Sequence, residues 1–179
     1  MRDDFRRMCA YCLLQEGAPI TGGYQSFQID HFRPVAKFPR LIRDYWNLYY
    51  CCHWCNNAKS DTWPNNDQAK RGYRFVDPCV DDFYGKHARL DVSGRLEALT
   101  TAGDFTIREI LLNRKIFRDL RSRRAAAQMT IERIKLRLRQ LAAEKEPRAE
   151  LIAALEDQLN TLSSSINPKV PYEPDDLLV

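Results

Sequence analysis

The stretch from Gln28 to Pro64 contains four candidate catalytic residues, of kinds that hydrolytic sites use. Asp30 and His31 are adjacent, Asn47 follows a tryptophan, and Asn56 follows a cysteine pair. Aspartate and asparagine side chains offer oxygen ligands to a hard divalent cation such as Mg²⁺. A neutral imidazole can take a proton from water near neutral pH. A metal ion and a base are sufficient to hydrolyse a phosphodiester, so this stretch is the candidate catalytic region.

Two cysteine pairs with C-x-x-C spacing predict a structural zinc site. The predicted ligands are Cys9, Cys12, Cys52 and Cys55. Four thiolates fill the tetrahedral coordination of Zn²⁺ and leave no position for water, so we expect the ion to clamp the first loop to the start of a helix. Cys51 is an alternative to Cys52, and Cys79 is interpreted as a small apolar residue. Free core cysteines are the alternative interpretation of the pairs.

The local pattern places the candidate residues on two strands and a short helix. Residues 26–32 alternate well enough for a strand that ends near Asp30 and His31, and residues 47–51 predict a second strand. A helix is expected from residue 52 to about residue 60, stopped by Pro64. Neighbouring side chains on a strand point to opposite faces, but the end of a strand lets Asp30 and His31 approach one cleft.

The order of these residues resembles the HNH nucleases, whose fold is a ββα unit that binds a catalytic metal. The matching elements are Asp30-His31, Arg33-Pro34, the WNL sequence around Asn47, the CxxCN sequence ending at Asn56, and Lys59. The resemblance implies that His31 activates the attacking water and that Asp30 and Asn56 bind catalytic Mg²⁺ or Mn²⁺. It also implies that Asn47 braces the loop that holds the histidine. The final motif position is usually His and is Asn56 here, which makes this chain an HNN variant.

Basic residues near the motif are candidate phosphate contacts. Lys59 lies one helical turn beyond Asn56, so we expect it to reach a neighbouring phosphate. Arg33, Lys37 and Arg40 follow His31 in the loop between the two strands and are candidate nucleic-acid contacts as well. A solvated surface charge is the alternative for each of them.

The C-terminal part predicts a helical hairpin. An apolar stripe runs through a helix from about residue 114 to residue 143, and a second stripe of Ile152, Leu155, Leu159 and Leu162 follows Pro147. At 1.5 Å per residue the two helices would be roughly 45 Å and 24 Å long. The shorter helix can cover only half of the longer one, so the remaining stripe must meet the preceding domain, a second copy or another protein. A strand hairpin is expected over residues 88–99 and a brief helix over residues 106–112.

We therefore predict an α+β fold with a zinc-stapled ββα core, a strand hairpin and a long helical hairpin. The predicted parts are a nuclease domain over residues 1–104, the helical hairpin over residues 105–165 and a flexible acidic tail over residues 166–179. Residues 105–148 carry 13 Lys and Arg against 5 Asp and Glu, which favours a surface that faces a polyanion.

Composition favours a cytoplasmic address. The segment MRDDFRRM has charges where a signal peptide needs an apolar run, and no apolar stretch approaches the roughly 20 residues that span a bilayer. In a reducing compartment, C-x-x-C pairs hold metal more often than they form disulfides.

Beyond the motif, the chain is similar to the short HNH nuclease subunits of bacterial anti-phage defence systems of the Septu and retron-associated types. The similarity covers roughly residues 9–125 and includes the DHFRP, DPC-DDF and LLN-RKIFRDLRSRR segments. It implies DNA as the substrate and a partner ATPase that docks through the helical hairpin; a homo-oligomer is a further arrangement. The alternatives are a catalytically silent zinc-stapled DNA-binding module and an adaptor that docks the ATPase.

Overall fold

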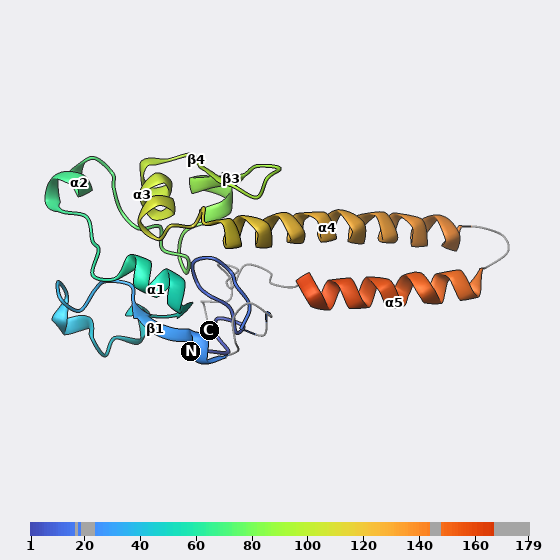
Figure 1. Ribbon diagram of the computed structural model, residues 1–179, viewed down its shortest axis with the longest axis horizontal. Helices are drawn as coiled ribbons and strands as arrows, with labels where there is room; N and C mark the ends of the chain where they lie inside the picture. The colour runs from blue at the N-terminus through green and yellow to red at the C-terminus, as the bar shows by residue number, and fades with distance from the viewer. Residues whose placement is uncertain (17, 19–23, 144–147, 167–179) are drawn as a thin grey trace. The chain divides into compact units, whose positions relative to one another are not determined.

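The computed structural model describes residues 1–16, 18, 24–143 and 148–166, and it shows a mixed α/β fold (Figure 1). Two small antiparallel sheets of two strands each precede a long C-terminal helix. The chain divides into two compact units, of which one extends to Asp119 and the other begins at Leu120. The domain boundary that the sequence suggested after residue 104 lies inside a helix of the first unit.

The first sheet and the helix after it form the part of the fold that the sequence predicted best. Strand β1 (Phe27–His31) pairs antiparallel with β2 (Leu48–Cys52), and His31 lies opposite Leu48 at the end of the ladder. Helix α1 (His53–Lys59) follows β2 without a loop. Two short 3₁₀ helices, η2 (Pro39–Leu41) and η3 (Tyr45–Asn47), lie in the connection from β1 to β2, which we call the crossing loop (residues 32–47).

The N-terminal segment forms turns over residues 2–7 and contains no helix there. Arg6 and Arg7 have φ angles of 48° and 58°, which place them in the left-handed region and interrupt any right-handed helix. Met8 instead forms an isolated antiparallel bridge with Gln15. The guanidinium of Arg2 donates to the buried carboxylate of Glu16 and closes the segment into a loop.

The second half of the first unit contains the predicted strand hairpin and three further elements. Strand β3 (Ala88–Leu90) pairs with β4 (Leu96–Ala98), as expected. Helix α2 (Asn66–Lys70), a π-helical turn η4 (Phe83–His87) and helix α3 (Thr101–Glu109) complete this half; a 3₁₀ turn η1 (Tyr24–Ser26) precedes β1.

Helix α3 begins five residues before the predicted helix and ends three residues before it. Thr100 caps the helix, because its Oγ1 accepts a hydrogen bond from the backbone N–H of Gly103 at 3.0 Å. A Cβ atom at position 103 would lie 2.0 Å from the carbonyl oxygen of His87, so only glycine allows this turn to approach η4 so closely.

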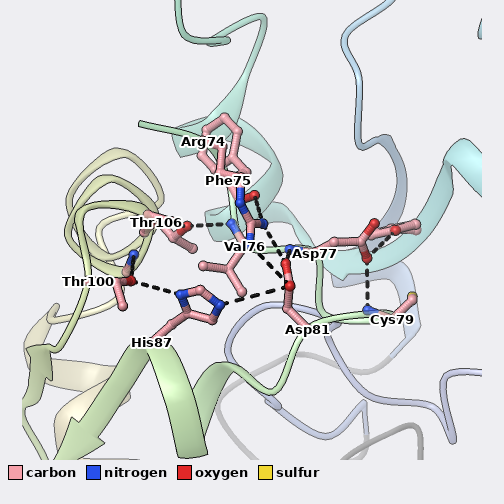
Figure 2. Close-up of polar contacts among 12 residues, drawn as sticks. Arg74, Phe75, Val76, Asp77, Cys79, Asp81, His87, Thr100 and Thr106 are labelled. Atoms are coloured by element: carbon pink, nitrogen blue, oxygen red, sulfur yellow. Dashed lines mark hydrogen bonds and ion pairs between the residues drawn. The ribbon is translucent and has the colours of Figure 1, made fainter. Parts of the chain in front are cut away.

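A polar network holds residues 74–81 against α3 (Figure 2). Figure 2 shows Arg74 paired with Asp81 at 2.5 Å, and the Oγ1 of Thr106 accepting from the N–H of Val76 at 2.8 Å. Burial raises the pKa of Asp81, but the hydrogen bonds from Arg74 and from the backbone N–H of Asp77, together with nearby positive charge, outweigh it, so the pKa lies below its ordinary value. Tyr49 of β2 donates to Asp77 at 2.6 Å, which connects the same segment to the first sheet.

The two predicted C-terminal helices are confirmed. Helix α4 covers Lys115–Ala142 and α5 covers Ala149–Ile166. Ile131, Ile134 and Leu141 of α4 are buried, and the predicted stripe on α5 is half-buried. Among the described residues, no helix is both long enough and apolar enough to cross a membrane. The predicted acidic tail lies outside the described residues from residue 167 onward.

Candidate functional site

The four predicted cysteine ligands come together. The Sγ atoms of Cys9, Cys12, Cys52 and Cys55 all lie within 4.8 Å of one another, and all four residues are buried. The Sγ atoms of Cys12 and Cys52 are 3.7 Å apart. Four sulfurs about 2.3 Å from a tetrahedral zinc ion would be about 3.8 Å apart, so the cluster could hold a zinc ion. Cys51 and Cys79 are not members of this group.

Local structure brings the first cysteine pair to the sheet. Cys9 and Leu14 are joined by a backbone hydrogen bond of 2.9 Å, and the N–H of Ala10 donates to the carbonyl of Tyr50 in β2 at the same distance. The pair is therefore fastened beside the junction of β2 and α1, where Cys52 ends the strand and Cys55 lies in the first turn of the helix. Burial raises the pKa of the Cys12 and Cys55 thiols well above the ordinary value, because anionic sulfur is poorly solvated there. A cation among the sulfurs would supply the missing stabilisation.

A pocket of about 280 Å³ lies between the end of β1, the crossing loop and α1. It is lined by Ile29, Asp30, His31, Pro34, Val35, Asn56, Asn57, Ser60 and Asp61. The structure thus brings Asp30, His31 and Asn56 to one cavity. The pocket is not lined by Asn47, by Lys59 or by the candidate phosphate contacts Arg33, Lys37 and Arg40.

His31 is held by a backbone carbonyl. Its Nε2 lies 3.1 Å from the carbonyl oxygen of Ile42. A carbonyl oxygen can only accept, so Nε2 carries the proton in the neutral ring and Nδ1 keeps its lone pair. The half-buried imidazole is therefore fixed in the tautomer whose Nδ1 can accept a proton.

Asn47 braces the crossing loop, as expected. Its Oδ1 accepts from the N–H of Arg33 at 2.8 Å, and its Nδ2 donates to the carbonyls of Arg33 and Leu41 at 3.1 Å and 3.3 Å. The side chain is buried, so these bonds replace water on both amide atoms. Asn47 thereby holds the part of the loop that presents the Ile42 carbonyl to His31.

Lys59 does not reach solvent, and the prediction that it contacts a phosphate is wrong. Its side chain is fully buried, and Nζ lies 3.0 Å and 2.9 Å from the two carboxylate oxygens of Asp30. Nζ also donates to the carbonyl of His31 at 2.8 Å. The last turn of α1 faces β1, so the ammonium is directed into the protein and not toward the exterior.

Asp30 is buried and has two partners. Besides Lys59, the hydroxyl of Tyr11 donates to its Oδ2 at 2.5 Å. Burial and the nearby Asp30 charge raise the pKa of Tyr11 well above its ordinary value, so this hydroxyl stays a donor. A carboxylate offers about four lone pairs, so Asp30 retains acceptor capacity at the pocket that it lines.

Asn56 presents an amide oxygen to the same pocket. Its Nδ2 donates to the Oε1 of Gln28 at 2.7 Å, which leaves Oδ1 as the oxygen ligand for a cation.

Sequence reasoning missed the part of the pocket that follows α1. Asn57, Ser60 and Asp61 add amide, hydroxyl and carboxylate groups, and Ser60 has a φ of 45° where the helix ends. Pro64 indicated the end of the helix but not the direction of these side chains. The combined oxygen groups fit the ligands that Mg²⁺ prefers in proteins.

The remaining basic candidates lie on the exposed surface of the crossing loop. Arg33, Lys37 and Arg40 are exposed, and the Nζ of Lys37 donates to the carbonyl of Trp63 at 3.0 Å. Their contact with nucleic acid stays a prediction.

No family model, no curated protein and no solved structure matches this chain.

Proposed function

We propose that this protein is a metal-dependent endonuclease of the HNH type that hydrolyses phosphodiester bonds in DNA. The observation that carries the proposal is the common pocket of Asp30, His31 and Asn56, in which the ring of His31 is oriented by a backbone carbonyl. The four-cysteine cluster supports it, because a structural zinc ion there would fix the start of α1 and therefore the position of Asn56. An effector role in a bacterial anti-phage defence system rests on the sequence resemblance.

In this proposal His31 is the general base. Its Nδ1 accepts the proton of the attacking water, while Nε2–H remains bonded to the Ile42 carbonyl, whose partial negative charge stabilises the imidazolium that forms. Asp30 and Asn56, joined by Asp61, would hold Mg²⁺ or Mn²⁺. When bound, the ion would neutralise charge on the phosphate and on the departing oxygen. Lys59 and Tyr11 hold the Asp30 carboxylate in position.

The test is cleavage of supercoiled plasmid with Mg²⁺ or Mn²⁺ by the full chain and by His31→Ala. Removal of a general base typically lowers the rate by about 10²–10⁴-fold. His53→Ala is the matched control, because this histidine lies in α1 with its Nδ1 3.3 Å from the Ser26 carbonyl and is outside the pocket. It should cut like the parent protein. Equal cutting by the parent protein and His31→Ala, at equal zinc content, would contradict the proposal.

A catalytically silent DNA-binding module is the second candidate. It is favoured by the contacts of Asp30, because a buried ammonium group already neutralises the carboxylate that a catalytic metal would use. This candidate predicts DNA binding that weakens steeply with salt, together with no cleavage product in any divalent metal.

The helical hairpin is the proposed docking site of a partner ATPase. Met129 and Leu136 of α4 are exposed apolar side chains that such a partner could cover. Truncation after Arg124 should abolish co-purification with the ATPase, and an unaffected complex would count against this role.

A further inference from the structure

The crossing loop exposes two aromatic side chains. Trp46 is 71% exposed, Tyr45 is 49% exposed and Ile42, three residues before Tyr45, is 50% exposed. Among the residues whose burial is described, Tyr45 and Trp46 are the exposed members of the aromatic class. We call Ile42, Tyr45 and Trp46 the aromatic patch. An aromatic surface exposed to water contributes little to folding, and grouped exposed apolar side chains are typical of a binding site.

The patch is held in place although it is not covered. The hydroxyl of Tyr45 donates to the Oδ2 of Asp4 at 2.5 Å, and the ring of Trp46 stands edge-on to that of Tyr45 with centroids 5.7 Å apart. The N–H of Trp46 donates to the Oδ1 of Asp44, which caps η3. Trp46 is followed by Asn47, the buried residue that braces the crossing loop. A ligand would therefore meet aromatic rings that are already ordered, which lowers the entropy cost of binding.

The charges around the patch select the class of ligand. Residues 32–47 contain four exposed basic side chains, those of Arg33, Lys37, Arg40 and Arg43. The only acidic residue in this range is Asp44, and it is half-buried and used as the cap of η3. Exposed aromatic rings among cationic side chains match a polyanion that carries flat apolar groups. Nucleic acid has this chemistry, because its bases stack on aromatic rings and its phosphates pair with Arg and Lys.

The same loop connects the patch to the candidate active site. The carbonyl of Ile42 binds the Nε2 of His31, while the Ile42 side chain belongs to the patch. Asn47 fixes both the loop and the residue after Trp46. A nucleic acid strand bound on the aromatic patch would thus contact the loop that orients His31, the proposed general base.

We propose that the aromatic patch is a stacking surface for unpaired bases of a single-stranded nucleic acid segment. In a duplex the faces of each base are covered by its neighbours, whereas an unpaired base offers a free face to Trp46. The exposed arginines of the crossing loop contact the phosphates of the same strand. The inference rests on the proposed function where it names the substrate of that site, but binding can be tested without cleavage.

The experiment uses the full, zinc-loaded chain with His31→Ala, so that no strand is cut. Fluorescence anisotropy measures the Kd of a labelled thymidylate strand, an abasic strand of equal length and a duplex. Trp46→Ala should weaken binding of the thymidylate strand about tenfold and leave the abasic strand nearly unchanged. Trp46→Phe should retain most of the affinity. Val92→Ala is the matched control, because Val92 is fully exposed in the β3–β4 hairpin, and it should bind like the parent.

A separate variant tests the cationic part of the surface. Arg40→Gln should weaken binding of the thymidylate and abasic strands alike and reduce the slope of log K against log salt by about 0.7. Trp46→Ala should leave this slope unchanged, because an uncharged ring releases no counterions.

Three results would overturn the inference. One is equal affinity of the parent for thymidylate and abasic strands. Another is a loss of duplex affinity in Trp46→Ala as large as its loss of single-strand affinity. The third is absence of binding to any nucleic acid, which would assign the patch to a protein partner. These binding measurements use the His31→Ala chain, which lacks the proposed general base. Failure of the parent protein to cut DNA would therefore remove the nuclease proposal and leave the base-stacking proposal standing.

Discussion

The Nζ of Lys59 lies 2.9 Å from the Oδ2 of Asp30, and neither side chain is accessible to solvent to a significant degree. This ion pair joins the last turn of α1 to the end of β1, next to the candidate base. Tyr11 completes the environment of the carboxylate from the N-terminal segment. These three buried side chains therefore connect three segments that are far apart in the sequence.

Lys59→Met should destabilise the protein strongly. Removing one partner of a buried ion pair leaves an uncompensated charge, which typically costs about 3–5 kcal/mol of the free energy of unfolding. The double variant Lys59→Met with Asp30→Asn should recover part of this loss. Urea denaturation gives the values, and Lys70→Met, in an exposed pair with Asp67, should change little. A loss for Lys59→Met no larger than that of the control would show that the buried pair does not form in solution.

The sulfur cluster should carry one zinc ion per chain. Cys52→Ser should lose the ion and lower the Tm, because the remaining thiols no longer complete a tetrahedral site. Cys79→Ser is the control, since this cysteine lies outside the cluster. Elemental analysis of the purified proteins and thermal unfolding with and without a chelator check both statements. Full zinc occupancy in Cys52→Ser would rule out the proposed ligand set.

Asn47→Ala should reduce stability and, under the proposed function, cleavage together. The change removes the Asn47 hydrogen bonds from part-buried backbone groups of Arg33 and Leu41, at up to about 1–3 kcal/mol for a group left unsatisfied. It also frees the loop that presents the Ile42 carbonyl to His31. Asn65→Ala is the control: it removes the cap of α2, at about 1 kcal/mol, but should leave the cleavage rate unchanged. Normal cleavage by a folded Asn47→Ala protein would contradict the positioning role.

The contribution of Glu16 should depend on pH. The hydrogen bonds from Arg2 hold the pKa of Glu16 below its ordinary value of 4.5, although burial opposes them. A folded-state pKa below the unfolded value stabilises the fold above about pH 4.5, and this stabilisation disappears as pH falls through the folded pKa. Glu16→Gln should thus be less stable than the parent at neutral pH and approach it in acid. Denaturation curves across this range give the comparison; a difference independent of pH would show that the ion pair is not responsible.

The elements closest to the site were predictable because their signals are local. Period-two alternation marked β1, the pattern of residues 47–51 marked β2, and Pro64 marked the end of the helix that follows. The approach of the two cysteine pairs followed from zinc chemistry alone. In contrast, α2 has only five residues, too few for a periodic pattern, and its local signal is the capping box of Asn65 and Gln68.

The differences between the predicted and the observed structure concern features that local sequence patterns do not specify. Helical spacing correctly makes Lys59 a neighbour of Asn56, but it does not say which side of α1 the sheet covers. Helix α3 begins at the Thr100 cap, and its close approach to His87 at Gly103 is a tertiary contact. The N-terminal turns arise from the left-handed residues Arg6 and Arg7, whose side chains give no warning of a positive φ.

Helix α1 has only seven residues, but it presents Cys55 to the sulfur cluster, Asn56 to the pocket and Lys59 to Asp30. Each residue of an α-helix turns the chain by about 100°. A single insertion or deletion between Asn56 and Lys59 would therefore rotate the ammonium group away from its carboxylate while the sulfurs stayed in place. Point substitutions elsewhere on this helix leave the angular order intact, so α1 should tolerate changes of residue type at Ala58 far better than any change of length.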